Sequence, residues 1–131
     1  MKWITEVAPD VPEVLGDPLQ IQQLVTHLVQ NAIAAMPDGG SLRLSVKAVE
    51  GEAVKLTDTD TGKGIPAALR ERIFDPFFGT KDQPARMGMG LSICHAIAEA
   101  HHGKITVESA EGQGTTFTLL LPAAPPQAHI Y

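Results

Sequence analysis

Two glycine-spaced patches and one asparagine are the parts of this sequence whose residue types and spacing could bind a phosphorylated ligand. Asp60 is followed by Gly62 and Gly64, and a second patch comes later at Gly88-Met89-Gly90. Asn31 precedes both patches. Together they offer a carboxylate for a base, bare backbone for phosphates and an oxygen ligand for a metal. We therefore interpret the set as a candidate Mg-nucleotide site.

The first patch closes an expected strand at residues 54–60. A carboxylate at a strand end can accept a hydrogen bond from an exocyclic amine such as that of adenine, and the glycines after it let the chain pass close to a flat base. An ordinary acidic turn is the alternative. Asp58 shares the face of Asp60, so we expect either solvent or a polar partner at this end of the strand.

Asn31 falls in the middle of an expected helix among apolar neighbours, where asparagine has poor propensity. Its amide oxygen is a hard ligand suited to Mg²⁺, which usually keeps several waters. His27 lies one turn earlier on the same face and could orient or deprotonate a water, or contact a phosphate. A surface asparagine and a structural histidine are the alternatives.

The second patch, with Leu91 after it, directly precedes an expected helix at residues 91–102. Glycine-rich turns at a helix N-terminus expose N–H donors where the helix dipole is positive. Residues 79–90 are predicted to form a mobile loop. Lys81 and Arg86 in this loop could reach phosphate oxygens, and solvated charge is the alternative for both.

The elements that must position these residues mix strands with helices. Asp17 and Pro18 are typical of a helix start, and the helix should stop before Pro37. We expect further helices at 67–73 and 91–102, and strands at 3–7, 41–49, 53–60, 104–109 and 115–121. This predicts an α+β sandwich with one mostly antiparallel sheet and helices on one face. Residues 1–122 should form one domain, and the Pro- and Ala-rich residues 123–131 a tail or linker.

Composition narrows the function classes. The 131 residues carry a net charge of −5, which argues against general nucleic-acid binding. No apolar run approaches the length of a membrane span, and no signal-peptide pattern opens the chain, so a cytoplasmic setting is expected. Cys94 is the only cysteine, which excludes a disulfide framework. Dinucleotide-binding, P-loop and HExxH motifs are absent, and the histidines at 95, 101, 102 and 129 lack zinc-ligand spacing.

In combination, the motifs resemble the ATP-binding catalytic domain of two-component sensor histidine kinases, in the superfamily of DNA gyrase, the ninety-kilodalton heat-shock chaperone and MutL. The resemblance covers residues 3–122. Its boxes occur in the family's order, namely 22–40, 60–65, 73–78 followed by Gly79-Thr80-Lys81, 88–92 and 114–117. The Ala-Met-Pro-Asp-Gly-Gly ending of the first box and the short loop after Lys81 are most similar to the nitrogen-regulation and oxygen-sensing kinases.

The resemblance implies a two-layer Bergerat-type fold that holds ATP and Mg²⁺ under a lid at residues 79–90. It implies that Asn31 is the metal ligand, that Asp60 accepts from the adenine amine, and that Asn31, His27 and Lys81 are the catalytic candidates. Implied ATP-binding residues are Asn31, Asp60, Gly62, Gly64, Ile65, Thr80, Lys81, Gly88, Met89, Gly90, Leu91 and Thr115. His27 stands where related ATPases have a glutamate base, and Asp58 where an apolar residue is usual.

The function implied is that of a protein-histidine kinase domain. Such a domain donates the γ-phosphate of Mg-ATP to a histidine on the dimerisation domain of the same parent kinase, which then serves a response regulator. We expect an excised catalytic domain that is incomplete without its phosphoacceptor. An ATP-hydrolysing clamp, an anti-sigma serine kinase and a non-catalytic nucleotide-binding module are the alternatives.

Overall fold

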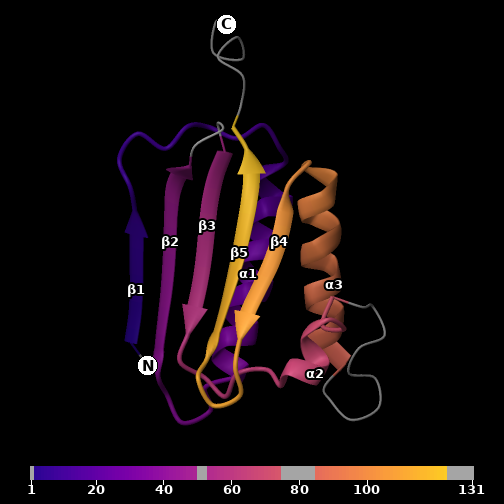
Figure 1. Cartoon of the computed structure of the whole chain (residues 1–131). Helices are drawn as coiled ribbons and strands as arrows, with labels where there is room; N and C mark the ends of the chain where they lie inside the picture. The colour runs from indigo at the N-terminus through magenta and orange to yellow at the C-terminus, as the bar shows by residue number, and fades with distance from the viewer. Residues whose placement is uncertain (1, 50–52, 75–84, 124–131) are drawn as a thin grey trace, which may run out of the picture.

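The computed structural model describes residues 2–49, 53–74 and 85–123, with the backbone alone for residues 85–90. The chain forms one five-stranded sheet, with the helices gathered on one face and the other face open (Figure 1). This is the α+β sandwich that the sequence predicts. The sheet has the order β1-β2-β3-β5-β4. The strands are β1 Lys2–Val7, β2 Ser41–Val49, β3 Ala53–Asp60, β4 Lys104–Ser109 and β5 Thr115–Pro122.

Strand pairing is parallel only between β1 and β2, and antiparallel elsewhere. The register aligns Asp60 with Thr115 of β5, so two residues from distant parts of the sequence lie side by side. Along β3 the even-numbered positions face the helices, and Val54, Asp58 and Asp60 are buried there. The period-2 alternation of the sequence therefore places one face of each strand in the core.

Helix α1 runs from Pro18 to Ala34 behind the sheet (Figure 1). The Asp17 carboxylate accepts from the backbone N–H groups of Leu19 at 2.9 Å and of Gln20 at 3.4 Å, which confirms the predicted N-cap. The helix ends at a C-cap on Ala35, two residues before the proline that was predicted to stop it. Its buried stripe consists of Leu24, Leu28 and Ala32.

Helix α3 begins earlier than the sequence predicts. It spans Ala85–Ala100, so residues 85–90 belong to a helix instead of the predicted mobile loop. Glycine lowers helix stability by only about 1 kcal/mol relative to alanine, and methionines, which are good helix formers, alternate with the glycines here. Residues 79–84 of the predicted loop lie outside the described residues. Helix α2 is Ala67–Arg70, shorter than the predicted 67–73, and a turn follows it.

The core lies between the helices and the sheet. Its fully buried members include Leu24 of α1, Cys94 of α3 and Leu119 of β5. The Cys94 thiol donates to the carbonyl oxygen of Leu24 at 3.5 Å, and burial together with the nearby Asp58 raises its pKa to about 12. Only the thiolate form of cysteine is reactive, and the raised pKa keeps Cys94 in its thiol form near neutral pH. Cys94 therefore serves as a packing residue.

A buried histidine fastens the start of α1 to the end of α3. His101 Nδ1 lies 2.9 Å from the carbonyl oxygen of Ile97, and Nε2 accepts from the backbone N–H of Asp17 at 3.0 Å. Since Nε2 accepts, Nδ1 carries the proton and donates. The two hydrogen bonds hold the N-cap of α1 in place.

Candidate functional site

A pocket opens at the end of the sheet where β3 stops and β5 starts. The sequence candidates Asn31, Asp60, Gly64, Ile65, Leu91 and Thr115 all line it, together with Ala35, Lys63 and Phe117. These residues come from α1, β3, the turn after β3, α3 and β5. The fold therefore gathers five separate stretches of sequence around one cavity.

Asp60 supplies the pocket's carboxylate. The residue is only 4% exposed, and its Oδ1 accepts from the backbone N–H of Gly62 at 2.8 Å. Burial raises the pKa of Asp60, while backbone N–H donors from Gly62 and Thr115 act in the opposite direction. The carboxylate is thus held in place by backbone donors. A ligand that donates a hydrogen bond to it would favour its ionised form.

Ser109 links pocket residues from different segments, Ile65 and Thr115, through its hydroxyl. Sequence reasoning missed this residue. Its hydroxyl donates to the carbonyl oxygen of Gly114 at 2.8 Å, accepts from the N–H of Ile65 at 2.8 Å and lies 2.9 Å from Thr115 Oγ1. Because the single Ser109 proton is used on Gly114, Thr115 must donate its own proton to Ser109. Thr115 Oγ1 is then left with acceptor lone pairs only.

Two glycines let the backbone close around Asp60. Gly64 has φ +73°, and a Cβ there would lie 2.0 Å from the carbonyl oxygen of Ala110. Gly114 has φ +86°, and a Cβ there would lie 2.1 Å from the carbonyl oxygen of Asp60. Both positions require glycine by conformation and by space. The sequence prediction included Gly64 but not Gly114, although Gly114 falls within a motif quoted above.

Asn31 presents an amide at the pocket wall from α1. Its Nδ2 is buried and has no hydrogen-bond partner among the described residues. The two amide atoms are assigned by the hydrogen-bond network, so an unpartnered end can equally present oxygen after a flip. A buried amide without a partner is unusual, and an external ligand would satisfy it. This fits a group that needs an oxygen ligand at the pocket.

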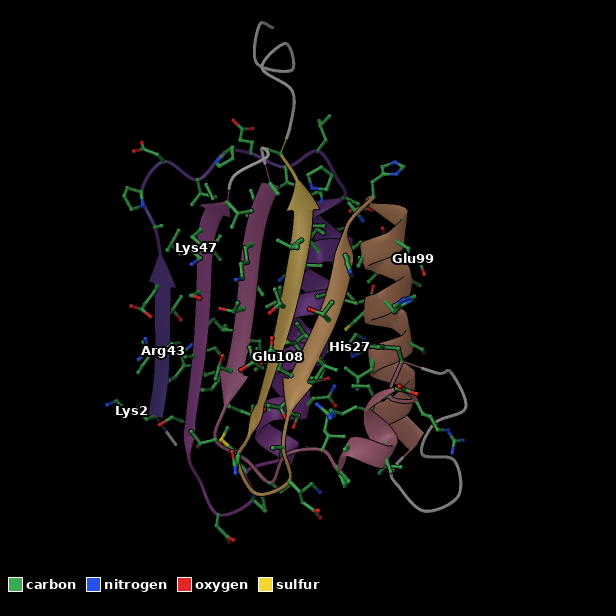
Figure 2. All side chains as sticks on the ribbon, viewed as in Figure 1. Lys2, His27, Arg43, Lys47, Glu99 and Glu108 are labelled. Atoms are coloured by element: carbon green, nitrogen blue, oxygen red, sulfur yellow. The ribbon has the colours of Figure 1, made fainter. Side chains whose placement is uncertain are left out.

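His27 lies one turn before Asn31 on α1 and is partly buried (Figure 2). It does not line the pocket in the part of the chain that the structure describes. Its predicted role on a water or a phosphate therefore stays a prediction. The same holds for Thr80 and Lys81, which lie outside the described residues.

Asp58 departs from both expectations stated for it. The residue is 0% exposed, so that part of the strand is dry, and neither carboxyl oxygen has a hydrogen-bond partner among the described residues. Its strand neighbours are Leu44 and Phe117, both apolar. Burial first, and the Asp60 charge second, raise the pKa of Asp58 to about 7. The sequence pattern could not reveal the burial of Asp58. Alternation assigns a residue to one face of its strand, but it does not show whether other elements pack over that position.

The Gly88-Met89-Gly90 patch is placed differently from its prediction. These residues lie inside the first turns of α3 instead of in a turn before it. In a helix only the N–H groups of the N-cap and of the first three helical residues lack a partner within the helix, and the helical ones here are those of residues 85–87. Gly88, Met89, Gly90 and Leu91 therefore do not offer free donors in this conformation. The interpretation of the glycines as a pre-formed turn was wrong.

The Asp60 carboxylate, the Thr115 hydroxyl and the Asn31 amide line one pocket, as a nucleotide site requires. The family model described as "Histidine kinase-, DNA gyrase B-, and HSP90-like ATPase" matches residues 16–125. The chain belongs to this family. Within it, the chain is an ATP-binding catalytic domain of the histidine kinase type, as its relatives show.

Two of these relatives are named sensory kinases. The chain is 45% identical over 113 residues to the sensor histidine kinase ZraS of Escherichia coli strain K12, which is 86% of this chain and 23% of ZraS. It is 40% identical over 124 residues to the adaptive-response sensory kinase SasA of Synechococcus sp. strain JA-3-3Ab, covering 93% of this chain and 33% of SasA. The chain thus spans about a third or less of the length of these curated relatives.

Solved structures agree with this assignment. The catalytic domain of histidine kinase ThkA matches with a TM-score of 0.81 at 34% identity, over 95% of this chain and 81% of that one. The sensor histidine kinase MprB from a mycobacterium matches with a TM-score of 0.81 at 28% identity, over 95% of this chain and 83% of that one. The fold and the kinase family therefore rest on both sequence and structure.

Among the described residues, no group of three or more histidine, cysteine or acidic side chains is placed to hold a metal ion. None of the helices in the described ranges has the length and apolar character to cross a membrane.

Proposed function

We propose that this domain binds Mg-ATP in the pocket at the end of β3 and donates the γ-phosphate to a histidine on the dimerisation domain of its parent protein. The proposal is carried by one observation, the pair of acceptors formed by the Asp60 carboxylate and Thr115 Oγ1. The Thr115 proton is engaged on Ser109, so both groups can only accept. An exocyclic amine, which donates two protons, is the partner that this pair fits.

The acceptor pair also predicts which purine binds. Adenine carries an amine at the position where guanine carries a carbonyl oxygen. A guanine oxygen facing the Asp60 carboxylate would leave buried acceptors without donors, and such mispairing costs roughly 1–3 kcal/mol per group. Ile65 and Phe117 provide apolar walls for the flat base. We therefore expect selectivity for adenine nucleotides of at least about tenfold.

The phosphates would follow from the base toward α1 and α3. Asn31 is the residue that would hold Mg²⁺, and when bound the ion neutralises phosphate charge and aligns the phosphate oxygens. Backbone N–H groups at the start of α3 would cradle the phosphates. We propose that α3 unwinds as far as Gly90 when these N–H groups bind the phosphates, because Gly88 and Gly90 lower the free energy that the loss of helix costs.

Phosphoryl transfer needs mainly positioning and charge neutralisation, so this domain has little covalent chemistry to perform. The nucleophile is the imidazole of the partner domain, which attacks the γ-phosphorus as the bond to the bridging oxygen breaks and ADP leaves. Lys81 remains our candidate for a cation near the γ-phosphate. His27 remains our candidate to orient a water or a phosphate from α1.

Partners and setting follow from the same proposal. ThkA has been crystallised in complex with a response regulator, TrrA, and this chain matches that kinase with a TM-score of 0.75 at 33% identity. We propose that the parent of this chain likewise passes its phosphoryl group to a response regulator. A cytoplasmic location would give the domain access to ATP.

The proposal is tested in two stages. Isothermal titration of the chain with non-hydrolysable ATP and GTP analogues, with and without magnesium, should show adenine-selective and magnesium-enhanced binding. Radiolabelled ATP should then label the histidine-bearing region of the parent protein only when this domain is added. Equal affinity for both purines would refute the role of the acceptor pair. Adenine-selective binding without any labelling would refute the transferase role alone.

A further inference from the structure

The open face of the sheet carries side chains in straight rows across its strands. The central row is formed by hydroxyls, with Ser45, Thr57, Thr118 and Thr106 on successive strands. Ser45 and Thr57 hydrogen-bond to one another through their hydroxyls. None of the helices that the structure describes covers this face, which turns toward the viewer in Figure 1. It is a flat, polar surface that the nucleotide pocket does not use.

A row of lysines lies at one end of this face. Lys47 of β2 is directly opposite Lys55 of β3, Lys55 is opposite Leu120 of β5, and Leu120 is opposite Lys104 of β4. Adjacent strands are about 4.8 Å apart, so the row extends roughly 14 Å across the sheet. Figure 2 labels Lys47 on this face. We call these three residues the lysine row.

The lysine row has no compensating salt bridge among the described residues. Like charges directly opposite one another in antiparallel strands are destabilising. None of the three lysines forms a salt bridge with a carboxylate among the described residues. At the other end of the same face, Arg43 is paired with Glu6 at 2.7 Å. In the part of the chain that the structure describes, a basic side chain is thus paired at one end of the face, and the three lysines at the other end are not.

The lysine row is separate from the nucleotide site. Lys55 and Asp60 are on the same strand but point to opposite faces of the sheet, since their numbers differ by an odd count. Five residues of strand place them roughly 17 Å apart along β3. A ligand on the lysine row would therefore leave the pocket free.

We propose that the lysine row, with the hydroxyl row beside it, is a docking surface for a carboxylate-rich segment of a partner protein. Lysine ammonium groups are mobile point charges that suit dispersed carboxylates, and the threonine and serine hydroxyls add hydrogen bonds to the same segment. Charge complementarity selects this partner, because three lysines without a salt bridge among the described residues stand together on a chain whose net charge is −5.

Two other polyanions fit the surface less well. A nucleic acid would meet repulsion from the rest of the acidic molecule. An anionic membrane would find three lysines and a single half-buried leucine, Leu120, which is too little for stable attachment. Arginine forks, the usual means of gripping phosphate in two-point contacts, are absent from the lysine row. An acidic protein segment remains the best match.

The test uses a synthetic oligoglutamate peptide as the probe and the ¹⁵N-labelled chain at about 20 mM salt, where screening is weak. Backbone amides at Lys47, Lys55 and Leu120 should shift on titration. The double variant Lys47→Gln/Lys55→Gln should bind the peptide about three- to tenfold more weakly, as expected for the loss of two exposed ion pairs. The matched control Lys2→Gln/Arg72→Gln carries the same charge change away from the lysine row and should lose less than about twofold.

The outcomes separate the possibilities cleanly. The proposal is overturned if the peptide shifts no amide of the lysine row, or if the two double variants weaken binding equally, which would indicate diffuse attraction. It is also overturned if vesicles containing phosphatidylserine bind the chain while the peptide does not. Titration of both variants with an ATP analogue should give wild-type affinity, which shows that any loss of peptide binding is not a loss of fold.

Discussion

Replacing Asp58 should make this domain more stable. The carboxyl is fully buried, has no hydrogen-bond partner among the described residues and is flanked on neighbouring strands by Leu44 and Phe117. Valine has high strand propensity and would suit these apolar neighbours. We therefore expect Asp58→Val to raise the free energy of unfolding, whereas most substitutions in a core lower it.

The magnitude follows from the shifted pKa. Burial raises the pKa of Asp58 from 3.8 to about 7, a shift of about three units. Each unit corresponds to about 1.4 kcal/mol, so ionised Asp58 lowers stability by about 4 kcal/mol. The folded state binds the proton more tightly than the unfolded state. Wild-type stability should hence fall as pH rises from about 4 to 7, and the full cost should be present above pH 7.

Urea denaturation followed by circular dichroism at pH 5 and pH 8 measures this effect. At pH 8, Asp58→Val should be more stable than wild type by about 4 kcal/mol from the removed charge, in addition to the roughly 1–3 kcal/mol of an unpaired polar group, a midpoint shift on the order of 2 M urea or more. At pH 5, about one unit above the ordinary pKa of 3.8, the charge still costs about 1.6 kcal/mol, so the gain should be smaller than at pH 8 by about 2.5 kcal/mol. Burial also raises the pKa of Asp60 in both proteins, so the difference between them reports Asp58 together with its coupling to Asp60.

Two asparagine variants complete the design. Asp58→Asn removes the charge but keeps a polar group, so it should recover the pH-dependent part of the gain and not the part that comes from the unpaired polar group. Asp38→Asn makes the same chemical change at an exposed turn residue and should alter stability by less than about 0.5 kcal/mol. A valine variant no more stable than wild type at pH 8, or a gain independent of pH, would refute the reasoning.

Four further predictions concern the nucleotide pocket. Asp60→Asn should weaken binding of an ATP analogue by roughly 1–3 kcal/mol in calorimetry, because a buried acceptor is replaced by a group that also donates; unchanged affinity would reject the adenine contact. Asn31→Ala should abolish the magnesium enhancement of that binding, and a metal titration like wild type would exclude Asn31 as the ligand. Ser109→Ala frees the Thr115 proton, so selectivity for ATP over GTP analogues should fall several-fold, roughly 1 kcal/mol; undiminished selectivity would contradict the assigned hydrogen-bond directions. Gly88→Ala with Gly90→Ala should stabilise α3 by about 1 kcal/mol per site and weaken ATP binding by a similar total, whereas equal or tighter binding would show that α3 does not unwind.

Much of this molecule was predictable from local sequence. The N-cap at Asp17 and the stop before Pro37 both depend on residues a few positions apart, and both are confirmed. The strands were predicted from period-2 alternation, which is also local. The glycine turn after Asp60 is also predictable from local sequence, since glycine itself permits the positive φ found at Gly64. The fold class and the position of Asp60 at a strand end followed from such signals.

Other features needed contacts that sequence reasoning does not supply. Ser109 gains its role only because strand pairing brings it beside Thr115 and the chain returns Ile65 to its hydroxyl. His101 holds an N-cap 84 residues away. The start of α3 at Ala85 reverses the expectation drawn from two glycines, because a propensity of about 1 kcal/mol is easily overridden.

The sequence by itself determined which residues could recognise an adenine nucleotide and which segments would be strands and helices, because those properties reside in residue types and short-range periodicity. Only the tertiary structure decided that Asp58 is sealed under the helices while Lys47 and Lys55 face outward across from one another. Alternation along a strand assigns residues to two faces. Which face a helix covers, and which strand lies alongside, depends on contacts between residues far apart in the chain.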